Sequence, residues 1–321
     1  MAAEPDRMSG CDFDLAVIGS GVGGLTAALF SAQLGLRTVV FADPMPGGQV
    51  LNVEELVNFP GLAAPTSGAD LCAIVEGQAT AAGAELRYDR ATAIGQAEGC
   101  FTVTSHQGAA TVQAVIVATG SSSRRLGIPG EDDFEGRGVS RCAACDGAFF
   151  KNQSVAVIGG GDSAAEGALL VAKFASEVLL VVREADLHAA ASTQAQVRAE
   201  PKIKLSTATE PVEITGGEAG VSALRLRHLS SDQHSDLTVS GVFIYAGLEP
   251  NTQLLAPLLT LEPTGHVATA PDMQTQTPGL YAIGDIRAGF AGYLINAASD
   301  GAVAAASAAR WISGRRSLLT A

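Results

Sequence analysis

The 321-residue sequence has few aromatic side chains, a shortage of positive charge and no long apolar run. Phe, Trp and Tyr make up 5% of it, so we expect a core built mainly from Ala, Val, Leu and Ile. The chain has 20 Lys and Arg against 33 Asp and Glu, which gives a formal net charge of −13. This balance argues against nucleic acid or an anionic membrane surface as a partner. No stretch approaches the ~20 apolar residues that span a bilayer.

The start of the sequence also lacks the apolar segment of a secretory signal, so we expect a cytoplasmic protein. The cysteines number five, an odd count that does not suit an extracellular disulfide framework. We expect Cys11, Cys72 and Cys100 to be small buried hydrophobic residues. The other two cysteines form a single CxxC, and none of the five histidines is paired with a second ligand. No metal site is therefore expected.

Two stretches of the chain have the order strand, glycine loop, helix, strand that is typical of a nucleotide-binding βαβ unit. The first has an apolar strand at 14–18, an Ala-rich helix at 25–35 and a second strand at 38–41. The same order begins again at 154–158 and reaches its second strand at 178–182. Helices that connect parallel strands cover the faces of the sheet. We predict an α/β fold with two Rossmann-like domains, the second inserted into the first.

Buried strands give way to polar linkers near residues 121–125 and 246–250, and we expect these linkers to act as twin hinges. The first domain would then consist of residues 1–120 and 250–321. The second, inserted domain would consist of residues 121–249.

The first glycine loop has the GxGxxG spacing and lies between a strand and a helix, the context that makes the motif meaningful. Gly19 permits the tight turn, Gly21 lets the backbone approach a pyrophosphate, and Gly24 lets the helix pack close to the sheet. The helix N-terminus then offers N–H groups and a positive dipole end. The ribose-binding acid is expected near Ala42, whereas the nearest carboxylate, Asp43, comes one residue later. We expect either Asp43 or backbone groups to hold the ribose.

The second glycine loop is similarly placed, but the segment after its second strand is poor in positive charge. A 2′-phosphate needs basic side chains there, whereas a carboxylate favours the free ribose of NAD. The chain offers Arg183, followed by Glu184 and Asp186. NADPH would meet a poor pocket, NADH remains open through Glu184, and a vestigial site without nicotinamide is a third reading. The residues expected to meet a nucleotide here are Gly159, Gly161, Asp162, Ser163, Arg183 and Glu184.

The CxxC, formed by Cys142 and Cys145, lies between the two glycine loops and is followed directly by Asp146. A second pair of ligands at similar spacing is absent, so we interpret the motif as a dithiol–disulfide couple rather than a zinc site. A helix that begins at the motif would favour the thiolate at neutral pH. Asp146 is suited to deliver or collect a proton during thiol exchange, although an acid here can also simply cap a helix.

The run from Ala118-Thr119-Gly120 through Pro129-Gly130-Glu131 to Cys142-Ala-Ala-Cys145-Asp146-Gly147 closely resembles the low-molecular-weight flavoprotein thioredoxin reductases. Further markers of the family occur in its order over roughly residues 12–312. They are Gly47-Gly48-Gln49, Asn58-Phe59-Pro60-Gly61, Gly159-Gly160-Gly161-Asp162-Ser163-Ala164, Ala246-Gly247-Leu248-Glu249-Pro250-Asn251 and Gly284-Asp285.

The resemblance implies that residues 1–120 and 250–321 bind FAD, that residues 121–249 form an NAD(P)-binding-like domain carrying the CxxC, and that the protein is a homodimer. It also implies that Cys145 lies nearer the flavin, that Cys142 attacks the substrate disulfide, and that the smaller domain rotates during turnover. The FAD-binding residues that follow from the resemblance and from the first loop are Gly19, Ser20, Gly21, Gly24, Asp43, Gly47, Gly48, Gln49, Asn58, Thr119, Gly120, Gly284, Asp285, Tyr293 and Leu294.

Two departures from the family fall on the nicotinamide side of the electron path. The family's HRRxxxR set for NADPH appears here as Val182, Arg183, Glu184 and His188. Its Arg-Gln pair near the flavin aligns with Gly292-Tyr293. Tyr293 is expected either to stack on the isoalloxazine ring or to pack against the sheet.

We therefore predict an FAD-dependent thiol–disulfide oxidoreductase that passes electrons from reduced FAD to Cys142–Cys145 and on to a thioredoxin-like protein. The missing basic residues favour a donor other than NADPH, as in branches of the family that have lost pyridine-nucleotide dependence, some of which use ferredoxin. A patch of Arg124, Arg125, Arg137 and Arg141 would suit an acidic ferredoxin or be only a solvated face. Three alternatives are an NAD(P)H-dependent reductase with altered nucleotide preference, a dithiol oxidase that uses oxygen, and a non-catalytic flavin-binding sensor.

Overall fold

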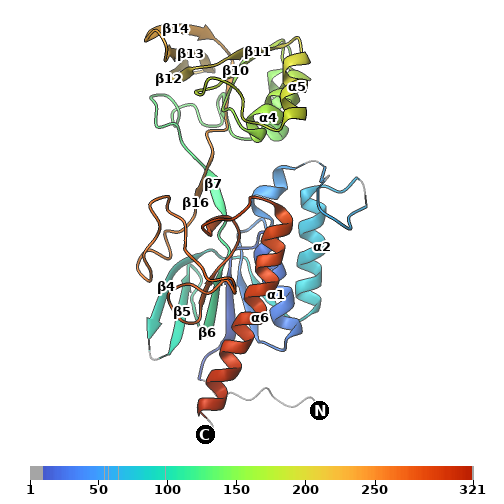
Figure 1. Cartoon of the computed structure of the whole chain (residues 1–321), viewed down its shortest axis with the longest axis vertical. Helices are drawn as coiled ribbons and strands as arrows, with labels where there is room; N and C mark the ends of the chain where they lie inside the picture. The colour runs from blue at the N-terminus through green and yellow to red at the C-terminus, as the bar shows by residue number, and fades with distance from the viewer. Residues whose placement is uncertain (1–9, 54, 57, 64, 98, 320–321) are drawn as a thin grey trace. The chain divides into compact units, whose positions relative to one another are not determined.

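The structure, a computed structural model, describes residues 10–53, 55–56, 58–63, 65–97 and 99–319. The chain divides into two compact units (Figure 1). Unit 1 comprises residues 1–122 and 250–321, of which 1–9 and 320–321 lie outside the described residues, and unit 2 comprises residues 123–249. The predicted α/β class with two Rossmann-like units is confirmed.

Unit 1 is built on a seven-stranded sheet with the order β3-β2-β1-β6-β5-β4, in which β17 also pairs with β6. The strands are β1 (Phe13–Ile18), β2 (Thr38–Phe41), β3 (Glu85–Arg87), β4 (Ala91–Ala97), β5 (Cys100–Ser105), β6 (Ala109–Val117) and β17 (Leu280–Ala282). The helices are α1 (Val22–Gln33), η1 (Gly48–Asn52), α2 (Gly68–Ala81), η3 (Gly284–Ile286) and α6 (Leu294–Leu319). Strands β1, β2, β3, β6 and β17 pair in parallel, whereas β4 and β5 form an antiparallel extension.

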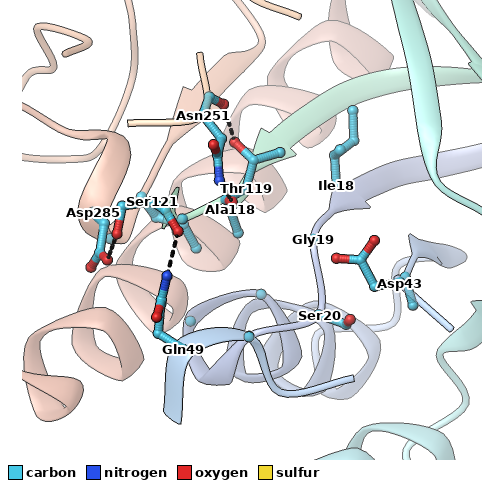
Figure 2. A pocket seen from close by; sticks show the side chains of 18 of the residues that line it. Ile18, Gly19, Ser20, Asp43, Gln49, Ala118, Thr119, Ser121, Asn251 and Asp285 are labelled. Atoms are coloured by element: carbon cyan, nitrogen blue, oxygen red, sulfur yellow. Dashed lines mark hydrogen bonds between the residues drawn. The ribbon is translucent and has the colours of Figure 1, made fainter. Parts of the chain in front are cut away.

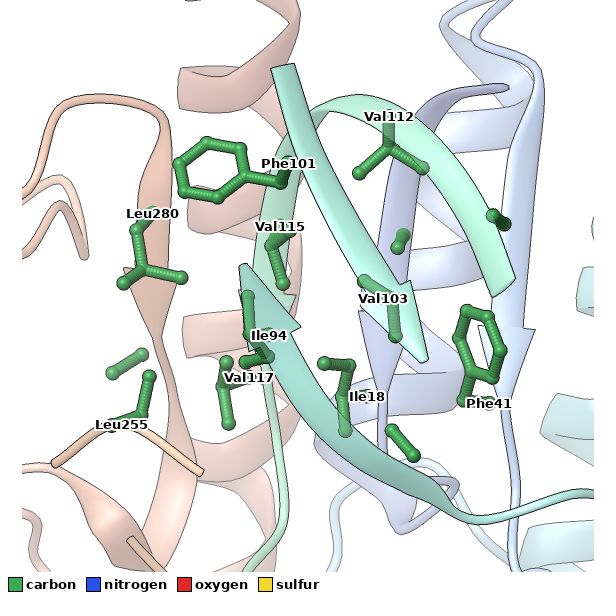
Figure 3. Packing of buried hydrophobic residues seen from close by; sticks show 14 of the residues in the cluster. Ile18, Phe41, Ile94, Phe101, Val103, Val112, Val115, Val117, Leu255 and Leu280 are labelled. Atoms are coloured by element: carbon green, nitrogen blue, oxygen red, sulfur yellow. The ribbon is translucent and has the colours of Figure 1, made fainter. Parts of the chain in front are cut away.

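The core of unit 1 fills both faces of this sheet. One face packs beneath the β4–β5 extension, where Phe101, Val115 and Leu280 from three strands meet (Figure 3). The other face lies under α1 and α6, which run side by side (Figure 1). Small residues allow this close approach, because a Cβ on Gly23 of α1 would come within 3.0 Å of the Ala297 carbonyl of α6.

Unit 2 contains a five-stranded parallel sheet with the order β11-β10-β9-β15-β8 and a three-stranded antiparallel sheet, β12-β13-β14. The strands of the first sheet are β8 (Val139–Ser140), β9 (Ser154–Ile158), β10 (Glu177–Val181), β11 (Ile203–Ser206) and β15 (Gly241–Ile244). Those of the second are β12 (Thr209–Gly217), β13 (Gly220–His228) and β14 (Gln233–Thr238). The helices are α3 (Ala143–Asp146), η2 (Gly147–Phe150), α4 (Asp162–Ala172) and α5 (Ala191–Ala199).

The chain passes between the units twice, through β7 (Ser121–Ser123) and β16 (Leu248–Pro250), which pair with each other. Both crossings fall within the linkers that the sequence indicates. The pairing is extended on either side, because the Arg124 amide donates to the Gly247 carbonyl and the Asn251 amide donates to the Gly120 carbonyl.

One expectation about the cysteines is wrong. Cys11 and Cys100 are not lone buried thiols, because the structure joins them in a disulfide. Cys72 does meet the expectation, since it is a buried free cysteine. The pairing of Cys11 with Cys100 brings together residues 89 apart in the sequence, and no local pattern indicates such a contact.

Candidate functional site

A cavity of about 730 Å³ opens in unit 1 where the parallel strands β1, β2 and β6 end (Figure 2). The carboxyl ends of parallel strands are where nucleotide sites form in sheets of this kind. Among the residues that we predicted to bind FAD, those that line the cavity are Gly19, Ser20, Gly21, Gly24, Asp43, Gly47, Gly48, Gln49, Thr119, Gly120, Gly284, Asp285 and Leu294. Asn58 and Tyr293 do not line it, and the Tyr293 side chain is 59% exposed.

The glycines of the first loop have different neighbours. A Cβ on Gly24 would lie 2.0 Å from the Gly19 carbonyl oxygen, and a Cβ on Gly19 would lie 2.3 Å from the Ala118 carbonyl oxygen. A Cβ on Gly21 would meet nothing nearer than the Gly47 carbonyl oxygen at 3.8 Å. Gly21 caps the N-terminus of α1 without a side-chain hydrogen bond. The loop therefore gives an open backbone surface at a helix N-terminus, which fits the pyrophosphate of a dinucleotide.

Polar groups from four segments are joined around the cavity (Figure 2). The Gln49 side-chain amide donates to the Ser121 carbonyl at 2.8 Å, and the Ser121 hydroxyl donates to Asp285 Oδ2 at 2.6 Å. On the other side, Thr119 Oγ1 donates to the Asn251 carbonyl at 2.6 Å, and Asn251 Nδ2 returns a bond to the Thr119 carbonyl. These contacts fix the polar groups before any ligand arrives. Sequence reasoning missed the part taken by Ser121.

The turn that carries Asp285 is held from α6 by a buried acid. Asp300, 5% exposed, accepts from the Gly284 amide at 3.2 Å. The same carboxylate accepts from Arg287 Nε at 3.0 Å. These two contacts join α6 to Gly284, at the start of η3, and to Arg287, directly after it, so they set the position of Asp285 at the cavity wall.

Arg90 lines the cavity and was not predicted. Its Nε donates to Asp43 Oδ1 at 2.7 Å, so the acid that we expected near the ribose is engaged by an arginine 47 residues away. The Arg90 side chain is largely exposed and the Asp43 side chain is about half exposed, and such surface pairs contribute little to folding stability. The sequence contains no signal for this contact, because it depends on the strand order of the sheet.

In unit 2 the structure joins Cys142 and Cys145 in a disulfide at the start of α3. Cys142 is the N-cap residue, and its Sγ accepts from the Cys145 amide at 3.1 Å. A backbone donor in the first turn of a helix therefore faces the Cys142 sulfur. Such a donor stabilises a thiolate when the pair is reduced.

Asp146 lies next to this pair through Ser140. The Ser140 hydroxyl donates to Asp146 Oδ2 at 2.6 Å and accepts from the Cys142 amide at 3.1 Å. The carboxylate of Asp146 is thus connected to the backbone of Cys142 through one hydroxyl. Sequence reasoning named Asp146 but missed Ser140, which comes from β8 and carries no recognisable motif.

Tyr245 supports the same helix from the end of β15. Its hydroxyl accepts from the Ala143 amide at 2.9 Å, which satisfies one of the free donors at the helix N-terminus. Burial, assisted by the negative charge of Asp146, raises the pKa of Tyr245, so the phenol keeps its proton. The ring fits because α4 has a glycine, Gly167, where a Cβ would come within 2.7 Å of it.

The second glycine loop is in contact with the chain's own side chains. A Cβ on Gly160 would come within 2.9 Å of the His188 ring, and a Cβ on Gly161 would lie 3.4 Å from His188 Nε2. Asp162, in the first turn of α4, accepts from the Ala190 amide at 2.7 Å. The segment that contains His188 and Ala190 therefore packs on the loop where a pyrophosphate would approach.

The charges beside this loop are mixed. Arg183 is the one plainly basic residue left at the positions of the family's HRRxxxR set for NADPH. Its Nε lies 3.5 Å from Glu210 Oε2. Glu184 is exposed, and Asp186 pairs with Arg198 at 2.5 Å. A 2′-phosphate would meet an arginine already paired with an acid and two carboxylates nearby.

The four arginines considered as a patch for an acidic partner are each engaged. Their partners are Glu249 for Arg124, Asp132 for Arg125, the Asp133 carbonyl for Arg137, and Glu131 and Glu135 for Arg141. Three of the four are paired with carboxylates, so the group does not present a block of uncompensated positive charge.

Within the described part of the chain, no helix is long and apolar enough to cross a membrane. The same residues contain no group of His, Cys, Asp or Glu that could hold a metal ion.

Comparisons with known proteins agree over most of the chain. The family described as "Pyridine nucleotide-disulphide oxidoreductase" matches residues 13–311. A thioredoxin reductase of Treponema pallidum is 38% identical over 301 residues, 94% of this chain and 97% of the relative. Among solved structures, a Lactococcus lactis thioredoxin reductase is 33% identical over 94% of this chain and 100% of its own, with a TM-score of 0.90. A ferredoxin-flavin thioredoxin reductase from Clostridium acetobutylicum is 26% identical over 94% and 98%, with a TM-score of 0.51.

Proposed function

Because this chain belongs to the pyridine nucleotide-disulphide oxidoreductase family and is a thioredoxin reductase-like flavoprotein disulfide oxidoreductase, we propose that it reduces the disulfide of a thioredoxin-like protein with electrons from a donor other than NADPH. The observation that carries this proposal is an asymmetry within unit 2. Hydrogen bonds connect the CxxC to Asp146 through Ser140, whereas the His188 ring lies against the second glycine loop, where a nucleotide would bind.

Residues at the start of α3 are arranged for thiol–disulfide exchange. In the reduced pair, the Cys145 amide stabilises a thiolate at Cys142, which makes Cys142 the attacking sulfur. It displaces one sulfur of the substrate disulfide and forms a mixed disulfide. Cys145 then attacks Cys142, which releases the substrate as a dithiol and closes the Cys142–Cys145 bond. Asp146 supplies the proton to the leaving thiolate.

The groups that line the cavity of unit 1 are chemically suited to bind FAD. The open glycine surface at α1 suits the pyrophosphate, and Gln49, Ser121 and Asp285 present polar groups along the wall. Bound there, FAD supplies the two-electron chemistry that a dithiol couple requires. Asp300 and Arg287 keep the turn at Asp285 in place for this role.

The second glycine loop supports the exclusion of NADPH as the efficient donor. His188 lies against Gly160 and Gly161, where a pyrophosphate needs close backbone approach. Arg183 is paired with Glu210, and Glu184 stands where the family's NADPH-binding HRRxxxR set has a basic residue. A 2′-phosphate would have to displace an acid from Arg183 and tolerate Glu184.

A ferredoxin is one candidate for this other donor, because one similar structure bears the name ferredoxin-flavin thioredoxin reductase. The pairing of the arginine group with acids does not support docking of an acidic protein there. Any ferredoxin would therefore need another surface of the protein.

We also propose that the protein is a homodimer. The neighbouring helices α1 and α2 carry exposed apolar side chains, Phe30 at 41% and Ile74 at 50%, and Leu34 at the end of α1 is 52% exposed. Apolar residues of this kind are suited to contact with a second copy. Light scattering during size exclusion measures the mass in solution, and a monomer would contradict this part of the proposal.

The donor proposal is tested by restoring charge at the second loop. The double variant Glu184→Arg, His188→Arg puts back two basic residues and removes both the carboxylate and the imidazole. We expect it to gain anaerobic flavin reduction by NADPH, whereas the matched control Glu184→Gln, His188→Gln, which adds no positive charge, gains little. If the wild type is already reduced by NADPH as fast as the double arginine variant, the proposed exclusion is wrong.

A second experiment isolates the thiol side from the donor. The enzyme is reduced with dithionite and then mixed with an oxidised thioredoxin. Once excess dithionite has been removed, the wild type should transfer up to two pairs of electrons, one from the Cys142–Cys145 dithiol and one from the reduced flavin. This transfer should be lost in both Cys142→Ser and Cys145→Ser. Cys72→Ser, which removes a buried thiol of the other unit, should transfer normally.

A further inference from the structure

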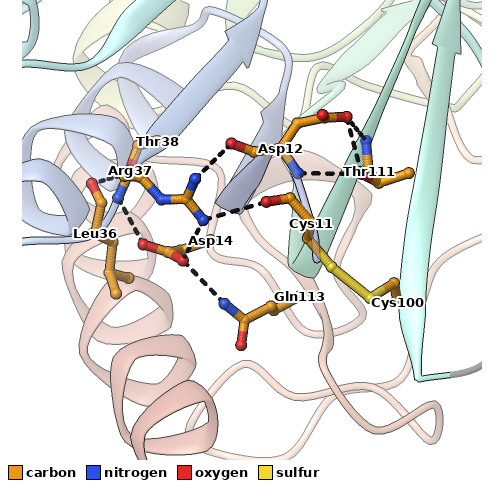
Figure 4. Close-up of polar contacts among 9 residues, drawn as sticks. All are labelled: Cys11, Asp12, Asp14, Leu36, Arg37, Thr38, Cys100, Thr111 and Gln113. Carbon is orange, nitrogen blue, oxygen red and sulfur yellow. Dashed lines mark hydrogen bonds and ion pairs between the residues drawn. A yellow bond between two sulfur atoms is a disulfide. The ribbon is translucent and has the colours of Figure 1, made fainter. Parts of the chain in front are cut away.

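A second disulfide joins Cys11 and Cys100 in unit 1, apart from the CxxC (Figure 4). Cys11 precedes β1 and is 7% exposed, whereas Cys100 is the first residue of β5 and is half-buried. Nothing in the proposed electron path uses this pair. Its place in the sheet indicates a separate role.

The backbone beside each cysteine is held by a different arginine. Arg37, directly before β2, donates to the Cys11 carbonyl at 3.3 Å and to the Asp12 carbonyl at 2.8 Å (Figure 4). Arg315, from α6, donates to the Gly99 carbonyl at 2.6 Å, one residue before Cys100. These bonds do not depend on the disulfide. We therefore expect each cysteine to keep its backbone position when the bond is open, which would allow repeated closing and opening.

Cys11 leads into β1 and Cys100 begins β5, the hairpin partner of β4, and both β1 and β4 reach the FAD cavity at their far ends. From Cys11 the chain runs along β1 to the glycine loop at Gly19. From Cys100 it turns back through β4, whose start at Ala91 lines the cavity beside Arg90. A bond between Cys11 and Cys100 thus fastens β1 to the β4–β5 hairpin at the ends remote from the cavity.

We propose that Cys11 and Cys100 are a second, reversible dithiol–disulfide pair that exchanges with low-molecular-weight disulfides and fastens the sheet of unit 1. The partly exposed Cys100 thiolate attacks the small disulfide and forms a mixed disulfide, releasing one small thiol. Cys11 then attacks the Cys100 sulfur and releases the second thiol. Two protein thiols lose two electrons and two protons, and one small disulfide becomes two thiols.

Cys72 does not compete for this exchange. Burial raises the pKa of the Cys72 thiol to about 11, so it stays protonated at neutral pH. A protonated thiol is a poor nucleophile. Cys72 is therefore the matched control for both cysteines of the pair, because it is a third cysteine of the same unit that is not expected to exchange.

The pairing is tested by peptide mapping after incubation in glutathione buffers that range from oxidising to reducing. Trypsin separates all the relevant cysteines, because Cys11 falls in residues 8–37, Cys72 in 38–87, Cys100 in 91–124 and the CxxC in 142–151. We expect a linked peptide of 8–37 with 91–124 under oxidising conditions and its loss under reducing ones. Absence of the linked peptide at every ratio overturns the proposal. Its persistence at every ratio also overturns it, because the bond would then be permanent.

The fastening is tested by thermal unfolding in the same buffers. A closed loop of this length should raise the thermal midpoint of unit 1 by about 5–10 °C over the reduced protein. The shift should fall in Cys11→Ser and in Cys100→Ser to whatever the CxxC alone contributes, and should stay at the wild-type value in Cys72→Ser. The CxxC is present in all of these proteins, so its own contribution cancels. An equal shift in Cys100→Ser would show that the pair does not fasten the sheet.

Discussion

Two glycines of the first loop allow the proposed FAD site to be separated from the stability of the fold. Gly24→Ala places a Cβ 2.0 Å from the Gly19 carbonyl oxygen, an overlap that the backbone must move to relieve. Overpacking of this kind costs about 1–3 kcal/mol or more. Gly21→Ala meets nothing nearer than 3.8 Å, and Gly21 has φ of −68° and ψ of 173°, an extended conformation open to alanine. Gly21 lines the cavity, so we expect the added methyl group to meet the bound ligand rather than the protein.

The two variants should therefore fail in different ways. Apoprotein of Gly21→Ala is expected to unfold at nearly the wild-type temperature, because surface substitutions cost about 0.5 kcal/mol or less. Its FAD affinity should fall by about 5- to 150-fold, which corresponds to a steric cost of about 1–3 kcal/mol against the bound pyrophosphate. Gly24→Ala should lose apoprotein stability as well.

The assay is titration of apoprotein with FAD, followed by the quenching of flavin fluorescence, beside thermal unfolding of the same apoprotein. Wild-type FAD affinity in Gly21→Ala would refute the placement of the pyrophosphate at this loop. An unchanged unfolding temperature in Gly24→Ala would refute the packing argument.

Three further predictions concern single residues. Burial raises the pKa of Cys72 in the folded protein to about 11, from an ordinary value of 9.0. Between pH 9 and pH 11 the thiol therefore ionises in the unfolded chain but not in the folded one. The free energy of unfolding should fall as the pH rises through this range. Urea unfolding over that range should show a smaller loss for Cys72→Ala than for wild type. Asp300→Asn should weaken FAD binding through Asp285, so in a double-mutant cycle its effect is largely absent once Asp285 is replaced by alanine. Tyr245→Phe leaves the Ala143 amide without its acceptor and should destabilise unit 2 by about 1–3 kcal/mol in urea unfolding.

The main elements of the fold could be predicted because each glycine loop has a local physical reason to lie between a strand and a helix. The boundaries were less accurate. Helix α1 begins at Val22 rather than at residue 25, since Gly23 and Gly24 lie inside the helix. Sequence propensity disfavours glycine there. Glycine is needed at both positions because α6 packs closely on Gly23 and the turn at Gly19 packs closely on Gly24. These tertiary contacts cannot be predicted from the local sequence.

The residues missed at the site are contacts made by the tertiary fold. Arg90 reaches Asp43 across 47 positions, and Tyr245 reaches Ala143 across 102. The disulfide of Cys11 with Cys100 likewise depends on the order of β1, β6 and β5 in the sheet. Local patterns identify residues whose spacing alone carries the chemistry, such as the CxxC. They do not identify partners that are adjacent only after the sheet has formed.

Anaerobic flavin absorbance, measured during addition of NADPH, is the most direct test of whether NADPH is the electron donor. We expect the oxidised flavin band of the wild-type protein to persist with NADPH and to disappear with dithionite, after which the reduced protein transfers electrons to a thioredoxin. Rapid and complete bleaching by NADPH at a low excess would contradict it.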